Sequence, residues 1–215
     1  MHASIVRNIL FPLHERLLNR PTISYINDLE KSQWLARDQV ELVQREKLKH
    51  LLRLAIEHCP WHKQRILAAN LDLSDDNLLT LKDLTKIPTM TKQDAQLHGQ
   101  DMTWAGVPGG AYQYTTGGSS GTPLNFHFGK SRQASDAAGR IRARRWWGVD
   151  LGDKEIYLWG APVELAKTDK IKQIRDRLMN QVLLNAFDMS PKTMANYLKV
   201  IQQYQPKCLY GYASS

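Results

Sequence analysis

Residues 112–128 read Tyr-Gln-Tyr-Thr-Thr-Gly-Gly-Ser-Ser-Gly-Thr-Pro-Leu-Asn-Phe-His-Phe. Tyr112 and Tyr114 alternate with polar neighbours, and so do the apolar residues of 124–128. This period of two is typical of strands. Glycines and hydroxyl side chains fill the segment between the two runs. We therefore predict two strands joined as a long hairpin by a loop, which we call the glycine–hydroxyl loop (residues 115–122).

The glycine–hydroxyl loop has the composition of a phosphate-binding loop. Glycine adopts positive φ angles easily and lets the backbone come close to a ligand, so that N–H groups can turn toward an anion. Hydroxyl groups add further donors. On composition alone, the alternative is a flexible surface hairpin without a ligand. The candidate phosphate-binding residues are Thr115, Thr116, Gly117, Gly118, Ser119, Ser120, Gly121 and Thr122.

Two well-known nucleotide-binding motifs do not describe this loop. A Walker A loop places a Lys directly after its last glycine and continues into a helix. Here Gly121 is followed by Thr122, Pro123 and a strand pattern. A dinucleotide-binding fingerprint spaces its glycines as Gly-x-Gly-x-x-Gly, whereas Gly117 and Gly118 are adjacent. The sequence therefore excludes both motifs.

Downstream of the hairpin, helical and strand patterns alternate. Ser190-Pro191 is a strong helix start, because a hydroxyl cap is followed by Pro at the first helical position. Helices that alternate with strands indicate an α/β layered fold. We predict helices over 131–147, 171–184 and from Ser190 to Pro206, a strand over 155–159, a buried strand over 208–210 and a turn at Gly211.

The region upstream of the hairpin is mainly helical. Apolar residues recur at helical spacing from residue 32 to about residue 70, and Pro60 interrupts the pattern. Thr91 is the expected cap of a short helix through residue 96. Residues 1–18 predict an amphipathic helix or arm that packs on the body. The chain is thus divided into a helical region, 1–98, and an α/β portion, 99–215, which contains the hairpin loop.

The chain has 215 residues and a formal net charge of +8, which favours anionic partners such as nucleotides, nucleic acids or membrane surfaces. No apolar stretch reaches the ~18–20 residues of a membrane-spanning helix, and the N-terminus does not resemble a signal peptide. Cys59 and Cys208 lack metal-ligand spacing and are expected to be reduced and mostly buried in a cytoplasmic protein. Pro60 disfavours a metal pair between His58 and His62.

Nucleic-acid binding is the rival class of function. Trp146 and Trp147 follow four arginines at positions 140, 142, 144 and 145, and such rings can stack on bases. The alternative is a solvated helix face with one Trp packed in the core. The sequence contains no recognised nucleic-acid-binding motif, and its positive charge is not concentrated on one element, so this class is disfavoured.

Residues 116–123, Thr-Gly-Gly-Ser-Ser-Gly-Thr-Pro, resemble the Thr-Ser-Gly-Ser-Thr-Gly-x-Pro signature of adenylate-forming enzymes. Within that superfamily, other segments are similar to the phenylacetate–CoA ligase and CapK-like branch, and they occur in the same order. These are His-Cys-Pro-Trp-His at 58–62, Leu-Lys-Asp-Leu-Thr-Lys-Ile-Pro-Thr-Met-Thr-Lys-Gln-Asp at 81–94 and Leu-Tyr-Gly-Tyr-Ala-Ser at 209–214. The resemblance covers residues 32–215.

The resemblance implies an enzyme that activates a carboxylic acid with ATP as an acyl-adenylate and then forms a thioester, commonly with coenzyme A. ATP and Mg²⁺ are the implied cofactors. The glycine–hydroxyl loop would hold the outer phosphates of ATP. Tyr210, Gly211 and Tyr212 would line the acyl or adenine pocket, although a core strand with its turn explains them equally well.

The sequence also departs from the family pattern. Gly117 stands where Ser is usual, and Leu124 stands where many members have Lys. Family members are substantially longer, and their acidic motif, their ribose-binding Asp and the catalytic Lys of their C-terminal domain have no counterpart here. No catalytic residue is therefore assigned. We expect the chain to be a fragment that lacks a C-terminal half, or an inactive truncated protein.

Overall fold

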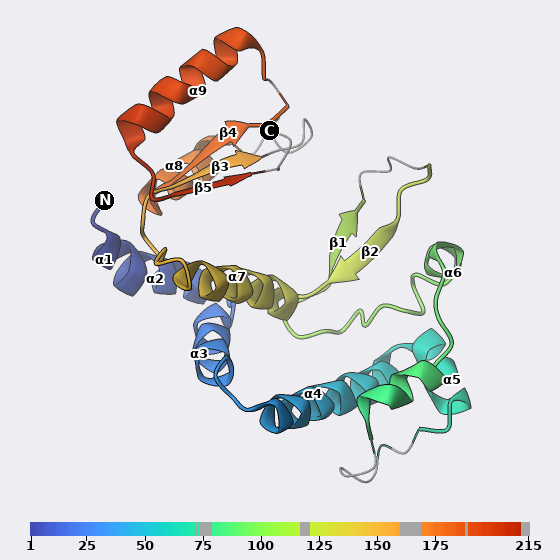
Figure 1. The fold of residues 1–215 in the computed structure, drawn as a ribbon. Helices are drawn as coiled ribbons and strands as arrows, with labels where there is room; N and C mark the ends of the chain where they lie inside the picture. The colour runs from blue at the N-terminus through green and yellow to red at the C-terminus, as the bar shows by residue number, and fades with distance from the viewer. Residues whose placement is uncertain (72, 74–78, 117–120, 160–168, 188, 212–215) are drawn as a thin grey trace. The chain divides into compact units, whose positions relative to one another are not determined.

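The computed structural model describes the chain except residues 72, 74–78, 117–120, 160–168, 188 and 212–215 (Figure 1). The described residues form a mixed α/β fold, as the sequence predicts. They divide into two compact units, one of residues 1–26 and 137–215 (the α/β unit) and one of residues 27–136 (the helix–hairpin unit). This division differs from the compositional boundary at residue 98, because the N-terminal helices pack with the C-terminal sheet.

Two helices build the core of the helix–hairpin unit. The helix α3 (Thr22–Ser32) leads into the unit. The helices α4 (Arg37–His58) and α5 (Pro60–Ala68) follow it in the chain and pack against each other. Pro60 is the first residue of α5, where its missing N–H costs nothing, so the predicted break is confirmed. Leu52, Ile66 and Leu79 are almost fully buried at the centre of this core.

Two capping boxes organise the segment before the hairpin. The 3₁₀ helix η2 (Leu81–Lys86) begins after Thr80, whose backbone N–H and hydroxyl donate to Asp83 Oδ2 over 2.7 and 2.8 Å. The helix α6 (Lys92–Leu97) begins after Thr91, which makes the same pair of bonds to Asp94 over 2.8 and 2.7 Å. The predicted Thr91 cap is therefore confirmed.

The α/β unit is built on three parallel strands. The helix α7 (Lys130–Arg145) leads from the hairpin into this unit, and it is followed by β3 (Glu155–Trp159), α8 (Asp169–Leu178), β4 (Gln181–Asn185), α9 (Pro191–Tyr204) and β5 (Cys208–Gly211). The strand order is β4-β3-β5, so each pair of consecutive strands is joined by a helical crossover, as parallel pairing requires. Ile156, in the central strand, is completely buried.

The N-terminal segment completes the α/β unit. It consists of α1 (Ala3–Ile5), the π-helical turn η1 (Val6–Leu10) and α2 (Phe11–Leu17), which follow one another without a break. Val6 is buried, and the amino group of Met1 donates to Asn180 Oδ1 over 2.9 Å. Gly152 allows the close approach, because a Cβ there would lie 2.4 Å from the Ala3 carbonyl oxygen. The expectation that the N-terminus packs on the body is confirmed.

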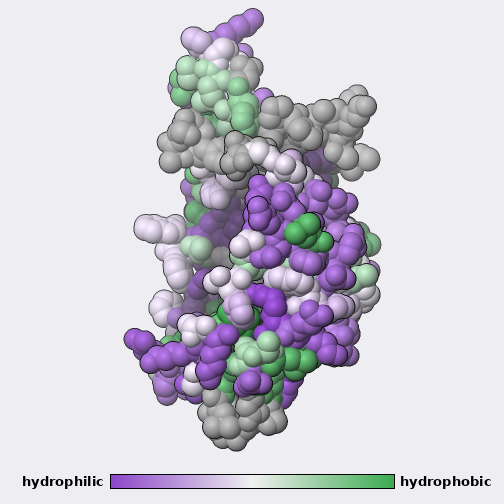
Figure 2. Space-filling model, turned by 90° about the vertical axis from the view of Figure 1, so that its right-hand side faces the viewer, coloured by the Kyte–Doolittle hydropathy of each residue, from purple (hydrophilic) through white to green (hydrophobic). Residues whose placement is uncertain are grey.

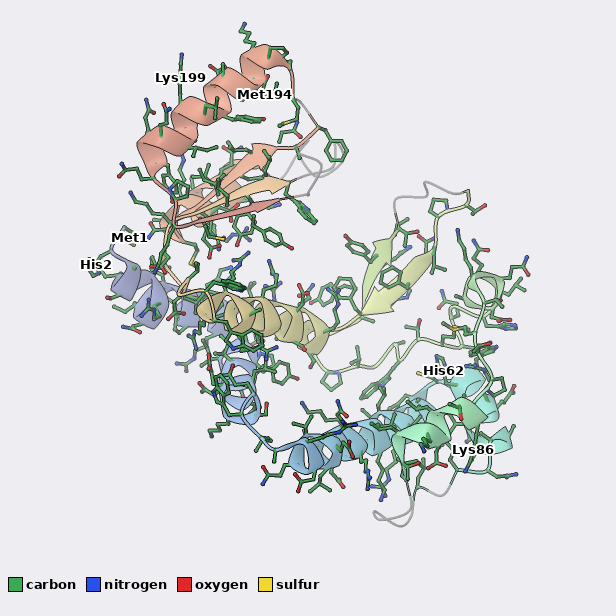
Figure 3. All side chains as sticks on the ribbon, in the orientation of Figure 1. Met1, His2, His62, Lys86, Met194 and Lys199 are labelled. Carbon is green, nitrogen blue, oxygen red and sulfur yellow. The ribbon has the colours of Figure 1, made fainter. Side chains whose placement is uncertain are left out.

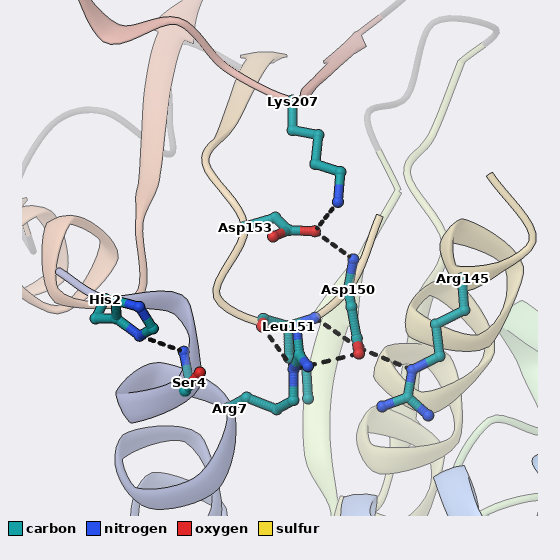
Figure 4. Close-up of polar contacts among 8 residues, drawn as sticks. All are labelled: His2, Ser4, Arg7, Arg145, Asp150, Leu151, Asp153 and Lys207. Atoms are coloured by element: carbon teal, nitrogen blue, oxygen red, sulfur yellow. Dashed lines mark hydrogen bonds and ion pairs between the residues drawn. The ribbon is translucent and has the colours of Figure 1, made fainter. Parts of the chain in front are cut away.

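A polar network joins this segment to the rest of the unit (Figure 4). Asp150 accepts from Arg7 over 3.2 Å and from Arg145 over 2.8 Å. Asp153 accepts from the Asp150 N–H and pairs with Lys207 over 2.8 Å. The network therefore connects the N-terminal segment, the end of α7 and the residue that precedes β5.

Three predictions in this unit are wrong. The helix expected over 171–184 stops at Leu178, because Asn180 adopts a left-handed φ of 59° and the apolar run after it forms β4. The strand over 208–210 is not buried: Leu209 is 59% exposed, since β5 lies at the edge of the described sheet. Gly211 is the last residue of β5, paired with Leu158, and not a turn.

Asp83 provides a pH test of the capping box. Hydrogen bonds from Lys86 and Thr80 lower its pKa from 3.8 to about 2. A lowered pKa in the folded state stabilises the protein above pH 3.8, and this contribution disappears as the pH falls through about 2. Asp83→Asn is therefore expected to lower the thermal midpoint at pH 6 and to converge with wild type near pH 2.

Thermal unfolding between pH 2 and pH 6 measures this difference. Asp28→Asn is the control, at an exposed helical position for which the described residues offer no hydrogen-bond or ion-pair partner. An Asp83→Asn deficit of equal size at both ends of the pH range would contradict the assignment of the pKa to this carboxyl.

Candidate functional site

The predicted hairpin is present in the helix–hairpin unit. The strands β1 (Tyr112–Thr115) and β2 (Asn125–Phe128) pair antiparallel, with Tyr112 opposite Phe128 and Tyr114 opposite Phe126. The glycine–hydroxyl loop is thus flanked by strands on both sides, unlike a Walker loop, which leads into a helix.

Thr116 closes the base of the loop. Its backbone N–H donates to the Leu124 carbonyl over 3.0 Å, and its hydroxyl accepts from the Leu124 N–H over 3.0 Å. The Thr115 hydroxyl donates to Asn125 Oδ1 over 2.6 Å. The proton of Thr115 is therefore used inside the hairpin, whereas the described residues offer the Thr116 hydroxyl proton no acceptor.

The far side of the loop begins at Gly121. Its φ of +118° lies in the region that favours glycine, and a Cβ there would meet no described atom within 4 Å. Gly121 and Thr122 are both exposed. Four candidates, Gly117, Gly118, Ser119 and Ser120, lie outside the described residues.

Aromatic side chains hold the two strands together. The pairing places Tyr112, Tyr114, Phe126 and Phe128 on one face of the hairpin. The ring of Tyr114 lies 5.5 Å from each of the two Phe rings, and the Arg132 guanidinium lies 5.2 Å from the Phe128 ring. An isolated two-stranded hairpin is marginal in water, and cross-strand aromatic pairs of this kind stabilise it.

The second candidate, at Tyr210 and Gly211, lies in the α/β unit, while Tyr212 lies outside the described residues. Tyr210 stacks on Trp159 with ring centroids 5.8 Å apart and planes 23° apart. Tyr210 and Gly211 both line an apolar groove of about 370 Å³ between α9 and the sheet. Met194, on α9, also lines this groove, whereas Lys199 points away from it (Figure 3).

Sequence reasoning missed a buried polar cluster beside Tyr210. Glu155 is 6% exposed, and its Oε2 accepts from Arg144 Nη1 over 2.6 Å and from the Tyr157 hydroxyl over 2.5 Å. Burial and the neighbouring Glu155 carboxylate raise the pKa of Tyr157 to about 12. The Arg144 guanidinium also lies 5.1 Å from the Tyr210 ring. The one sequence signal was an acidic residue at the start of an otherwise apolar strand.

This buried cluster lines a larger cavity of about 440 Å³ in the α/β unit. The N-terminal segment, α7, α8 and one face of the sheet enclose it. Its wall mixes apolar side chains with ion pairs, among them Arg144–Glu155 and Arg175–Asp176. Because these charged groups pair with one another, we interpret the cavity as a gap in the packing of the unit and not as a binding site.

The histidines of the 58–62 segment take part in packing. His58 stacks on Trp104 at 3.8 Å, and His62 meets the Trp61 ring edge-on at 5.1 Å. Burial of the ring lowers the pKa of His62, and repulsion from the nearby positive charge of Arg65 lowers it further. Among the residues that the structure describes, no group of three His, Cys, Asp or Glu side chains is arranged to hold a metal ion.

Both cysteines are free thiols. Cys59 and Cys208 are each buried over most of their surface, as expected. Burial raises the pKa of each thiol. A raised pKa leaves less of the reactive thiolate at neutral pH, which agrees with a packing role.

The tryptophans after α7 are both exposed, Trp146 to 58% and Trp147 to 85%. The expectation that one of them packs in a core is wrong. The helix α7 ends at Arg145 and a turn follows, with Gly148 at a φ of 72°. Arg144 is instead the side chain that turns toward the sheet, while Arg142 lies 4.5 Å from the Trp146 ring.

Positive charge is divided unequally between the units. The α/β unit contains 16 Lys and Arg against 8 Asp and Glu, whereas the helix–hairpin unit contains 13 of each. The whole net charge of +8 thus belongs to the α/β unit. On the face shown in Figure 2, hydrophilic residues predominate and hydrophobic ones lie in small groups among them. No described helix is long and apolar enough to cross a membrane.

No protein-family model matches the chain. No curated protein matches it either. Solved structures do: 2-hydroxyisobutyryl-CoA ligase with 2-HIB-AMP and CoA, in the thioesterification state, matches with a TM-score of 0.59 and 17% identity over 82% of this chain. An open conformation of that ligase, with the same two ligands, matches with a TM-score of 0.57 and 19% identity over 84%.

The chain spans only part of these ligases, 38% and 42% of their length. At such low identity the likeness shows the fold, and the described residues share the fold of part of this ligase. The predicted fold class is therefore confirmed.

Gly211 gives a test of the strand pairing at the second candidate. A Cβ there would lie 2.8 Å from the Leu158 carbonyl oxygen, so β3 and β5 would have to move apart. Gly211→Ala is expected to lower the free energy of unfolding by about 1–3 kcal/mol, the usual cost of overpacking. Urea denaturation measures the change.

Gly139→Ala is the matched control, since a Cβ in that helix meets nothing within 4 Å. It is expected to stabilise the protein by up to about 1 kcal/mol through helix propensity. Equal effects of the two substitutions would show that β5 does not pair with β3 this closely.

Proposed function

We propose that the chain is the part of an adenylate-forming acid–CoA ligase that carries the phosphate-binding hairpin, of the phenylacetate–CoA ligase and CapK-like branch. The observation that carries the proposal is the hairpin: two paired strands flank a glycine–hydroxyl loop whose ends are tied together through Thr116 and Leu124. The likeness of the fold to a CoA ligase solved with an acyl-adenylate and CoA supports it.

The proposed reaction has two steps. A carboxylate oxygen attacks the α-phosphorus of ATP, which forms the acyl-adenylate and releases pyrophosphate. The thiolate of coenzyme A then attacks the acyl carbon, which forms the thioester and releases AMP. The cytoplasm, where both ATP and coenzyme A are available, is the proposed location.

The loop would position the outer phosphates and stabilise the charge on the departing pyrophosphate. Backbone N–H groups and hydroxyls aimed at developing charge lower a barrier because they need little reorganisation. The donors would come from residues 116–122, with the Gly121 N–H among them, at an exposed residue whose φ only glycine adopts easily.

Mg²⁺ would enter this chemistry with ATP. Magnesium commonly binds substrate phosphates and keeps several waters, with only one or two protein carboxylates. The described residues contain no acidic cluster that would hold it by themselves. Its chemistry, when bound, is to share the phosphate charge, and no protein ligand is assigned to it.

The groove beside Tyr210 and Gly211 would take the acyl group. Its volume of about 370 Å³ lies in the range of small-molecule pockets. Its lining is apolar apart from the hydroxyls of Tyr197 and Tyr210. The side chain of Tyr210 is 40% exposed. The groove therefore favours an acid with a hydrocarbon or aromatic body.

The loop assignment predicts a response to nucleotide. ATP with Mg²⁺ is expected to raise the thermal midpoint of the protein, and Gly118→Val with Gly121→Val is expected to abolish the shift. Side chains at these positions would remove the backbone freedom that the phosphate contacts need. Thermal shift with increasing ATP measures the effect.

Gly106→Val is the control for this pair, because it lies in another loop of the same unit and a Cβ there makes only ordinary contact with Trp104. Its shift should equal that of wild type. A shift that survives in the double variant would overturn the loop assignment.

The chain's partial span of its structural neighbours predicts a missing activity. The 215-residue protein is expected to show no acid-dependent exchange of pyrophosphate into ATP, even though it binds ATP. A panel of aromatic and aliphatic carboxylic acids in a pyrophosphate-exchange assay tests this. Exchange with any acid would show that the described portion is sufficient for the first step.

A further inference from the structure

The N-terminal segment exposes a row of apolar side chains. Ile5, Ile9, Leu13 and Leu17 are spaced four apart in the helical turns and are 44%, 58%, 51% and 74% exposed. Residues four apart lie on the same side of a helix, so these four form one row, which we call the N-terminal stripe. A contiguous exposed apolar surface of this kind marks an interaction site more often than a scattered one.

The stripe cannot turn inward, because the other side of the same helices already faces the core. Val6 is 1% exposed, and the buried Glu15 accepts from the hydroxyl of Thr22. Arg7 donates to the Leu151 carbonyl and pairs with Asp150, and the Met1 amino group is bound by Asn180. The segment is thus fixed to the α/β unit and presents the stripe outward.

The exposed polar residues of the segment that carries the stripe are neutral or cationic. Residues 1–27 contain Arg7, Arg16 and Arg20, and their one acidic residue, Glu15, is buried. Arg7 pairs with Asp150 and Arg20 with Glu15. The first exposed carboxylate is that of Asp28. The α/β unit as a whole carries the entire net charge of +8. The stripe is therefore an apolar surface on a unit of net positive charge.

We propose that the N-terminal stripe binds the surface of an anionic lipid bilayer, with the helices lying in the plane of the headgroups. Amphipathic helices that do this combine Leu, Ile or Phe on one side with Lys and Arg around them, and both apolar burial and attraction to anionic lipid contribute. A second copy of the chain fits the stripe less well, because two units of charge +8 would repel each other.

Vesicle flotation with the 215-residue protein tests the proposal. Wild type is expected to float with vesicles of phosphatidylcholine containing about 30% phosphatidylserine and to bind pure phosphatidylcholine weakly. Ile9→Gln with Leu13→Gln is expected to lower the partition coefficient at least about tenfold, since two side chains that the bilayer would bury are lost. Added salt should weaken the binding of wild type.

Ile174→Gln with Leu178→Gln is the matched control, at two residues of α8 in the same unit that are 60% and 43% exposed. Circular dichroism checks that both double variants fold. Equal flotation of the two variants, or equal binding to neutral and anionic vesicles, would overturn the proposal. So would a wild-type dimer that the stripe variant dissociates, or binding to random duplex DNA without binding to vesicles.

Discussion

The buried carboxylate of Glu155 is the constraint on which the assembly of the α/β unit depends. A charge removed from water costs several kcal/mol unless it is paired and hydrogen-bonded. Arg144 and the Tyr157 hydroxyl satisfy it, and because Arg144 lies in the last turn of α7, the end of that helix is fixed over the first residue of β3. The same guanidinium lies against the ring of Tyr210 in β5. The backbone N–H of Glu155 donates to the carbonyl of Asn180, the residue before β4, so Glu155 and Arg144 connect β3 to both of its neighbours.

Much of the fold follows from local signals. The alternation around the glycine–hydroxyl loop predicts the hairpin, the Thr91 and Ser190 hydroxyls predict the caps of α6 and α9, and Pro60 marks where α5 begins. These features are decided within a few residues of chain. The failures came where distant partners decide. Residues 181–185 have an apolar run that suits a helix or a strand, and pairing with β3 selects the strand.

The candidate site shows the same division. Loop composition reveals possible phosphate donors, but it does not show that the Thr115 hydroxyl is already bonded to Asn125 or that Thr116 ties the loop to Leu124. The run of arginines in α7 predicts a solvated face, yet Arg144 is drawn inward by a carboxylate eleven residues away in sequence. Both outcomes depend on a second residue whose position only the tertiary fold fixes.

The division of charge bears on how the proposed loop would bind phosphates. The helix–hairpin unit has equal numbers of acidic and basic residues, and Leu124 stands where a phosphate-binding Lys would come in many adenylate-forming enzymes. Binding by the hairpin would therefore rest on oriented N–H groups and hydroxyls, which act over a short range and must be placed accurately. The tie between Thr116 and Leu124 supplies that placement at one end, and the φ of Gly121 supplies it at the other. The positive charge of the α/β unit is then available to attract a different anionic partner, the proposed lipid bilayer. The N-terminal stripe would add apolar contacts with that partner.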